Sequence, residues 1–262
     1  MKDQGSRAKL VGGGIDVALY GTSGTEVLID VTGLGLDEIE QSADTLSLGA
    51  SVTLTELLEH PASADLYGGV LRDVLRDVAS PLLRNMATVA GTIASAHPWS
   101  DMISLFLAMD ARLTCYDAGG EKTIPLETML SDRASLHTSL IVGVRLPVSS
   151  IAVQFEKFTR TGFDVGVLNC AVGLVPNNQD CTQVRIVLGG TPAIASRVPA
   201  GEQLLEGNQL TDAAIEEAAT AVAEALEVRD DLRASAAYRR ELAAVGVRRC
   251  LNRIAEGWSA GT

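Results

Sequence analysis

Residues 84–101 read RNMATVAGTIASAHPWSD, and this stretch decides the fold more than any other part of the chain. Small residues dominate it, and its middle follows neither the helical nor the strand period. That composition suits a backbone packed tightly against a ligand or another chain segment. Asp101 or Ser100 is expected to cap an apolar helix from Met102 to Met109 directly after it.

Strand-like runs and helical stripes alternate before this stretch. A run at residues 8–11 leads into three glycines, and further strands are expected at 27–31 and 46–50. Thr53 is a good N-cap for a helix at 54–59, and an apolar stripe predicts another helix at about 69–79.

After the stretch, strands are expected at 112–116 and 140–147, and the pattern pauses at Ser149-Ser150. We place a domain boundary there, which gives domains at 1–148 and 151–256. The last third predicts strands at 153–158, 165–175 and 184–188. Helices follow from Thr211 to about Val228, and from Ser235 to an end at Gly257 with Tyr238 facing inward. Strands followed by helices indicate an α+β fold.

Gly12, Gly13 and Gly14, here called the glycine loop, follow the first strand. Without a Cβ, such a run lets several backbone N–H groups approach phosphate oxygens. The run fits neither G-x-G-x-x-G nor a P-loop. A tight strand-to-strand turn is the alternative interpretation.

Residues 88–92, here called the threonine segment, offer hydroxyls and a further glycine. They could form a second phosphate-binding loop or simply fill a crowded crossing. Asp101 could cap a helix or accept hydrogen bonds from a ligand. Lys157 could lie on a solvated strand face or near a ligand.

Charge and composition exclude several classes of function. The net charge of −12 disfavours binding to nucleic acid and to anionic membrane surfaces. The first residues are polar and no apolar run is long enough to span a bilayer, so we expect a cytoplasmic protein. Four scattered cysteines are expected to be buried thiols, and no metal site or catalytic triad is indicated.

Residues 84–101 resemble the signature RN-x-A-T-I-G-G-N-I-x-x-A-S-P-x-x-D of the xanthine dehydrogenase and carbon monoxide dehydrogenase medium-subunit family. LVGGGIDV at 10–17 is similar to the family's first FAD loop, L-x-A-G-G-T-D-L. VRLP at 144–147 and FEKFTR at 155–160 also match, and so do VLGG at 187–190 and SAAYRR at 235–240. The likeness covers nearly the whole chain in order.

This resemblance implies a flavin domain of the vanillyl-alcohol-oxidase (PCMH-like) type. A domain like the carbon monoxide dehydrogenase flavoprotein C-terminal domain, an antiparallel sheet plus helices, would follow. The pyrophosphate of FAD would lie against the two glycine-bearing segments, Asp101 would hydrogen-bond the cofactor, and Ile141 and Lys157 would lie near the flavin. The implied cofactor-binding residues are Leu10, Val11, Gly12, Gly13, Gly14, Ile15, Asp16, Val17, Thr88, Val89, Ala90, Gly91, Thr92, Ser95, Asp101, Ile141 and Lys157.

The implied function is that of an FAD-binding electron-transfer subunit of a multi-subunit molybdenum hydroxylase. Electrons would pass from [2Fe–2S] clusters through FAD to NAD⁺ or another acceptor. The chain has no cluster cysteines and no sign of a molybdopterin domain, so a molybdopterin-binding large subunit and an iron–sulfur small subunit would be its partners. No side chain is expected to act as a catalytic acid or base.

The sequence departs from the family pattern in three ways. Only eleven residues precede Gly12, so the family's N-terminal strand and helix look truncated. Ala90 and Thr92 replace a glycine and an asparagine of the signature, and Ile15 replaces a threonine. We expect the Cβ of Ala90 to crowd the pyrophosphate. Two alternatives therefore stay open: a stand-alone reductase like UDP-N-acetylenolpyruvoylglucosamine reductase, and a flavin-free scaffold subunit.

Overall fold

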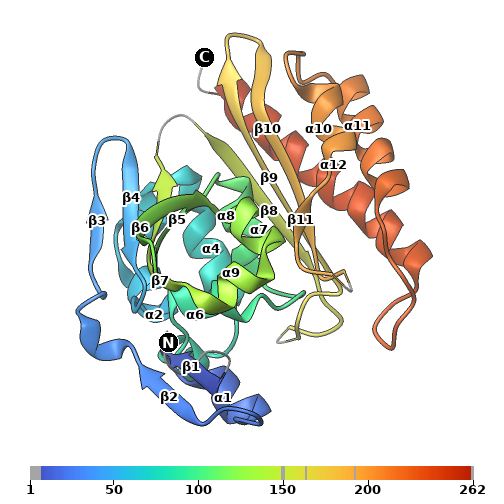
Figure 1. Ribbon diagram of the computed structural model, residues 1–262. Helices are drawn as coiled ribbons and strands as arrows, with labels where there is room; N and C mark the ends of the chain where they lie inside the picture. Colours follow the sequence, from blue (N-terminus) through green and yellow to red (C-terminus); the bar gives the residue numbers. More distant parts are fainter. Residues whose placement is uncertain (1–6, 149–150, 163, 192, 261–262) are drawn as a thin grey trace.

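The computed structural model describes residues 7–148, 151–162, 164–191 and 193–260. Two antiparallel sheets and a small parallel pair of strands organise these residues, with helices packed around them (Figure 1). The expected α+β class is confirmed. The boundary placed at Ser149-Ser150 lies outside the described residues.

A small β-α-β unit forms the N-terminal edge of the molecule (Figure 1). It consists of β1 (Ala8–Val11), α1 (Ile15–Tyr20) and β2 (Val27–Asp30), with the two strands parallel. No residue of α1 is buried, so this unit adds little to the core. The strand-to-strand alternative for the glycine loop is wrong, because a helix follows Gly14 directly.

The first large sheet belongs to the N-terminal domain and has the strand order β3-β4-β7-β5-β6. Its strands are β3 (Ile39–Gln41), β4 (Thr45–Gly49), β5 (Arg112–Asp117), β6 (Gly120–Pro125) and β7 (Leu140–Pro147). Each neighbouring pair is antiparallel. The short edge strand β3 and the hairpin partner β6 were not expected, since neither carries a clear alternation.

Short helices accompany this sheet. They are α2 (Leu54–Glu59), α3 (Ala62–Asp65), α4 (Val70–Asp77), α5 (Pro81–Arg84), α6 (Val89–Ser95), α7 (Asp101–Ala108), α8 (Leu126–Ser131) and α9 (Arg133–Thr138), with 3-10 turns at Thr32–Leu34 and Tyr67–Gly69. Thr53 caps α2 through a full capping box with Glu56, as its sequence position predicts. Helix α7 is buried along its whole length, and its polar residues Asp101 and Ser104 are buried together with the apolar ones.

The second large sheet has the order β11-β10-β9-β8 and belongs to the C-terminal domain. Its strands are β8 (Ala152–Phe158), β9 (Leu168–Asn177), β10 (Asp180–Gly189) and β11 (Ser196–Arg197). Helices α10 (Pro199–Leu205), α11 (Asp212–Ala225) and α12 (Ala236–Ala260) cover the face turned away from the first sheet (Figure 1). The expected strand at 165–175 begins only at Leu168.

This second sheet separates two hydrophobic cores. Ala171 and Val187 face the N-terminal domain, where α7 packs against β9 and β10. Their neighbours Cys170 and Ile186 face α11 and α12 on the other side. Because both faces are covered, β9 is buried from Leu168 to Leu174, and every residue of this stretch except Asn169 is apolar.

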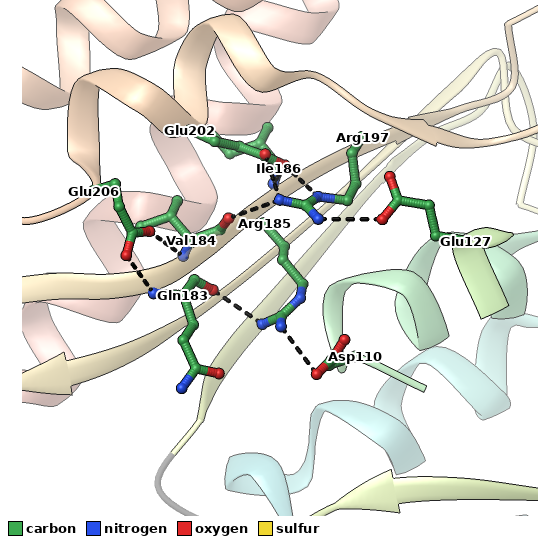
Figure 2. Close-up of polar contacts among 9 residues, drawn as sticks. All are labelled: Asp110, Glu127, Gln183, Val184, Arg185, Ile186, Arg197, Glu202 and Glu206. Carbon is green, nitrogen blue, oxygen red and sulfur yellow. Dashed lines mark hydrogen bonds and ion pairs between the residues drawn. The ribbon is translucent and has the colours of Figure 1, made fainter. Parts of the chain in front are cut away.

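Ion pairs join the two domains beside these cores (Figure 2). Arg185 on β10 lies 3.0 Å from the Asp110 carboxylate, and Arg197 on β11 lies 3.2 Å from the Glu127 carboxylate. The same Arg197 guanidinium donates to both oxygens of the buried Glu202, at 2.9 and 2.7 Å. These contacts hold the second sheet against α7 and α8. They therefore fix which residues of the C-terminal domain face the N-terminal domain.

The last helix begins after Ser235 as predicted, since the Ser235 hydroxyl accepts from the Tyr238 amide, but its inward face and its end differ from the prediction. Tyr238 is 51% exposed, whereas Arg239 beside it is fully buried. Arg239 donates to the carbonyls of Val167 and Ala234 and pairs with Asp231, so its charge is satisfied inside the fold. Helix α12 also continues through Gly257 to Ala260, because that glycine does not take a left-handed conformation.

Within the described residues, no helix is both long enough and apolar enough to cross a bilayer.

Candidate functional site

The glycine loop turns the chain from β1 into α1 and leaves its amides free. Gly14 takes a left-handed φ of 72°, which a residue with a Cβ adopts only at a cost. The N–H groups of Gly12, Gly13 and Gly14 find no acceptor among the described residues. Three adjacent free donors in front of a helix are the arrangement that suits a phosphate.

The glycine loop packs directly on the turn between α5 and α6. A Cβ on Gly13 would lie 1.6 Å from the carbonyl oxygen of Met86, so only glycine fits there. A Cβ on Gly12 would lie 3.0 Å from Oγ1 of Thr88. The structure therefore brings the two predicted cofactor segments side by side.

The threonine segment is the capped start of helix α6, and its prediction as a loop is wrong. Oγ1 of Thr88 accepts from the Gly91 amide at 3.0 Å, which caps the helix. The backbone amides of Val89 and Ala90 donate to the carbonyls of Val52 and Ala50. Small residues hide the helical period here, since only Val89 and Ile93 supply buried apolar side chains.

Because these amides already have protein acceptors, the threonine segment offers hydroxyls rather than backbone donors. The partly exposed Thr92 and the buried Thr88 supply them, whereas Ser95 already donates its hydroxyl to the Gly91 carbonyl. The side chain of Ala90 packs against the first core. The crowding of the pyrophosphate by the Ala90 Cβ stays a prediction, although this side chain is partly engaged by the core.

One further polar atom near this segment lacks a partner. The Ser51 hydroxyl is the buried side-chain oxygen without a hydrogen-bond partner among the described residues. It lies between Ala50 and Val52, whose carbonyls hold the start of α6. A buried hydroxyl without a partner is an exception in folded proteins, and this one lies between the two residues whose carbonyls hold the start of α6.

A histidine links the two segments across the site. Nε2 of His97 lies 3.1 Å from Oδ1 of Asp16 on α1. The His97 ring stacks on Trp99 at 4.7 Å between centroids. This contact ties α1 to the segment that follows α6, although the sequence did not single out His97 for such a role.

Asp101 begins α7, but Ser100 is its cap, because the Ser100 hydroxyl accepts from the Ile103 amide. The Asp101 carboxylate lies 2.7 Å from Nζ of Lys157 and accepts from Nδ2 of Asn169 at 2.8 Å. Burial raises the pKa of this carboxyl, while Lys157 and Asn169 oppose the rise. The Lys157 side chain is only 16% exposed, so the solvated-face interpretation of Lys157 is wrong.

The remaining predicted residues lie close to these groups or beneath them. Leu10 and Val11 end β1, while Ile15 and Val17 lie on α1. Ile141 is buried on β7 in the first core, in the sheet against which α6 packs. A separate hollow of about 550 Å³ lies at the β5–β6 turn and contains none of the predicted residues.

The arrangement fits a dinucleotide cofactor whose phosphates accept hydrogen bonds from groups of this chain. Free amides and hydroxyls from the two adjoining segments can bind phosphate oxygens. The Asp101–Lys157 pair places a carboxylate and an ammonium where the two domains meet. Within the described residues, no group of three or more His, Cys, Asp or Glu side chains could hold a metal ion.

Comparison with known proteins identifies the protein family to which these features belong. Residues 1–149 match the model described as the FAD binding domain in molybdopterin dehydrogenase. Residues 153–254 match the model of the CO dehydrogenase flavoprotein C-terminal domain.

Individual relatives agree over almost the whole chain. The carbon monoxide dehydrogenase medium chain of Hydrogenophaga pseudoflava is 29% identical, over 95% of this chain and 89% of that protein. The nicotine 6-hydroxylase medium subunit of Paenarthrobacter nicotinovorans is 27% identical, over 93% of this chain and 88% of that protein.

Solved structures agree as well. A carbon monoxide dehydrogenase from Hydrogenophaga pseudoflava superimposes with a TM-score of 0.86 at 27% identity, covering 96% of this chain and 90% of that chain. The quinoline 2-oxidoreductase of Pseudomonas putida 86 gives a TM-score of 0.83 at 26% identity, over the same shares of the two chains. The chain therefore belongs to the family of FAD-binding medium subunits of molybdopterin dehydrogenases.

Proposed function

We propose that this chain binds FAD and passes electrons within a heteromeric molybdenum hydroxylase. The observation that carries the proposal is the glycine loop, whose three amides find no acceptor among the described residues. Gly13 packs so closely on the Met86 carbonyl that a Cβ there would clash with it. Family membership supplies the identity of the cofactor. Bound FAD would supply a redox centre that accepts electrons singly or in pairs.

The chain's own residues bind and orient the cofactor. Amides of Gly12, Gly13 and Gly14 hold phosphate oxygens, and the hydroxyls of Thr88 and Thr92 add donors. Asp101 accepts a hydrogen bond from a cofactor hydroxyl or N–H group. Lys157 lies 2.7 Å from that carboxylate, and its positive charge opposes the rise in the Asp101 pKa that burial causes.

The partners that we propose are a molybdopterin-binding large subunit and an iron–sulfur small subunit. The relatives' names support this, since they describe a medium chain and a medium subunit. NAD⁺ as the terminal acceptor and a cytoplasmic location stay predictions.

Purification of the chain with its genomic neighbours tests the proposal. We expect a complex with flavin absorbance and with iron and molybdenum. A yellow single chain that oxidises a nicotinamide cofactor without partners would contradict the proposal in favour of a stand-alone reductase.

A flavin-free scaffold is the second candidate, because the amides of the threonine segment are already engaged by protein. A colourless but intact complex that contains iron and molybdenum would favour this candidate.

A further inference from the structure

A buried chain of polar side chains joins the domains behind Asp101. The Ser104 hydroxyl on α7 donates to Oδ1 of Asn169 on β9 at 2.7 Å. Nδ2 of Asn169 donates in turn to Oδ1 of Asp101 at 2.8 Å. Ser104 and Asn169 are fully buried and Asp101 is 7% exposed. Neither the glycine loop nor the threonine segment takes part in this hydrogen-bond network.

The orientation of the Asn169 amide is fixed from both ends. Asp101 and Ser104 are three residues apart on α7, so they share one face of the helix. The Asp101 carboxylate accepts from the amide nitrogen, which turns the amide oxygen toward the Ser104 hydroxyl, whose shorter contact is to that oxygen and whose longer one is to the Ser100 carbonyl.

Gly189 closes the remaining side of the amide. A Cβ at this position would lie 2.4 Å from Oδ1 of Asn169 and 2.5 Å from Oγ of Ser104. Gly190 next to it donates its amide to the Pro98 carbonyl at 2.7 Å. The two glycines of the VLGG motif thus let β10 approach the start of α7 and leave room for the Asn169 amide.

The network leaves Asp101 able to accept further bonds. Lys157 contacts Oδ2, and the same ammonium donates to the Asp77 carbonyl at 3.3 Å. Each carboxylate oxygen therefore has one protein donor and keeps one acceptor position.

Hydrogen bonding alone does not decide which of the two positions carries the charge. With Asn at 101 and Asp at 169, the amide oxygen would accept from Lys157 and the amide nitrogen would donate to position 169. The Ser104 hydroxyl would still find an acceptor there. The carboxylate instead lies at 101, the last residue of the 84–101 stretch that contains the threonine segment.

We propose that Asn169 is a positioning residue that holds the Asp101 carboxylate in the orientation in which it binds the flavin cofactor. Ser104 and Gly189 fix the Asn169 amide for that task. This inference rests on the proposed function, because it assigns Asn169 to the same FAD site.

FAD titration of the full-length chain, followed by flavin fluorescence, tests the inference together with thermal unfolding. We expect Asn169→Leu to weaken FAD binding about tenfold, the effect of one hydrogen bond to a charged group. Ser104→Ala should weaken it several-fold. Ser63→Ala is the matched control: this fully buried serine donates to the Leu58 and His60 carbonyls, away from the network, and its loss should leave FAD binding unchanged.

The exchange Asp101→Asn with Asn169→Asp separates positioning from mere structure. It keeps every hydrogen bond of the network, so we expect a folded chain with a melting temperature close to that of the natural protein. FAD binding should nevertheless stay at least tenfold weaker, because the carboxylate has moved.

Two results would overturn the inference. One is natural FAD affinity in the exchanged variant, and the other is natural affinity in a folded Asn169→Leu variant. If the unaltered chain binds no FAD at all, the proposed function itself fails, and the inference fails with it. This outcome differs from the two above, in which the unaltered chain binds FAD.

Discussion

The glycine loop and the threonine segment adjoin each other and both contain glycine, yet they use it in opposite ways. In the glycine loop, glycine permits a left-handed turn and a close approach to Met86, and three amides find no acceptor in the part of the protein that the structure describes. In the threonine segment, Gly91 fits under the Thr88 cap, and the amides are taken by Thr88, Ala50 and Val52. We therefore assign phosphate binding mainly to the glycine loop and the shaping of the site mainly to the threonine segment.

Gly13→Ala is the change with the largest expected effect on this comparison. Its Cβ would overlap the Met86 carbonyl, so the glycine loop must move. Restoring the binding geometry of the displaced loop would cost about 1–3 kcal/mol, as overpacking does, which corresponds to roughly five- to 150-fold in FAD affinity. The melting temperature should change little, because α1 buries no residue.

Fluorescence titration with FAD and a thermal melt measure both effects of Gly13→Ala. Gly33→Ala is the matched control, since a Cβ there meets nothing within 4 Å. FAD affinity within twofold of the natural value in the Gly13→Ala variant would remove the glycine loop from the site.

Thr88→Val should have the opposite pattern of effects, a lower melting temperature with only a small loss of FAD affinity. Loss of the helix cap costs about 1 kcal/mol of stability, which lowers the melting temperature by roughly 2–4 °C in a chain of this size. FAD affinity should fall only about threefold, since one hydroxyl is lost among several donors. Calorimetry and FAD titration measure the two effects.

Thr88→Ser keeps the hydroxyl and should restore most of both properties. A loss of FAD affinity in Thr88→Val larger than that in Gly13→Ala would reverse our ranking of the two segments.

His97→Phe is the smallest change that we predict. It keeps an aromatic ring against Trp99 but loses the bond to Asp16. A partly exposed pair of this kind contributes about 0.2–1 kcal/mol, so FAD affinity should fall no more than about fivefold. Asp16→Asn should have a similar effect, and the double variant should be no worse than either one. Additive losses would show that the two side chains act independently.

The sequence predicted the parts of this site that depend on local pattern. The residues at 10–17 and 84–101 indicated the cofactor segments, and Thr53 marked a helix start that the structure confirms. Helix α6 was missed, because alanine, glycine and threonine give no apolar period.

Contacts between distant residues could not be predicted in the same way. The engaged amides of α6 depend on carbonyls in the turn after β4, and the Asn169 bridge depends on β9 meeting α7. Arg239 was overlooked for the same reason, since a buried arginine is recognisable only from the carbonyls that surround it. Such pairings arise from packing of the two domains rather than from any spacing along the chain.

Titration of the unaltered full-length chain with FAD tests the central claim most directly. We predict saturable quenching of flavin fluorescence at one FAD per chain, with the bound flavin retained on gel filtration. Absence of saturable quenching from a folded chain, both alone and in an intact complex with its partners, would contradict the claim that this protein binds FAD.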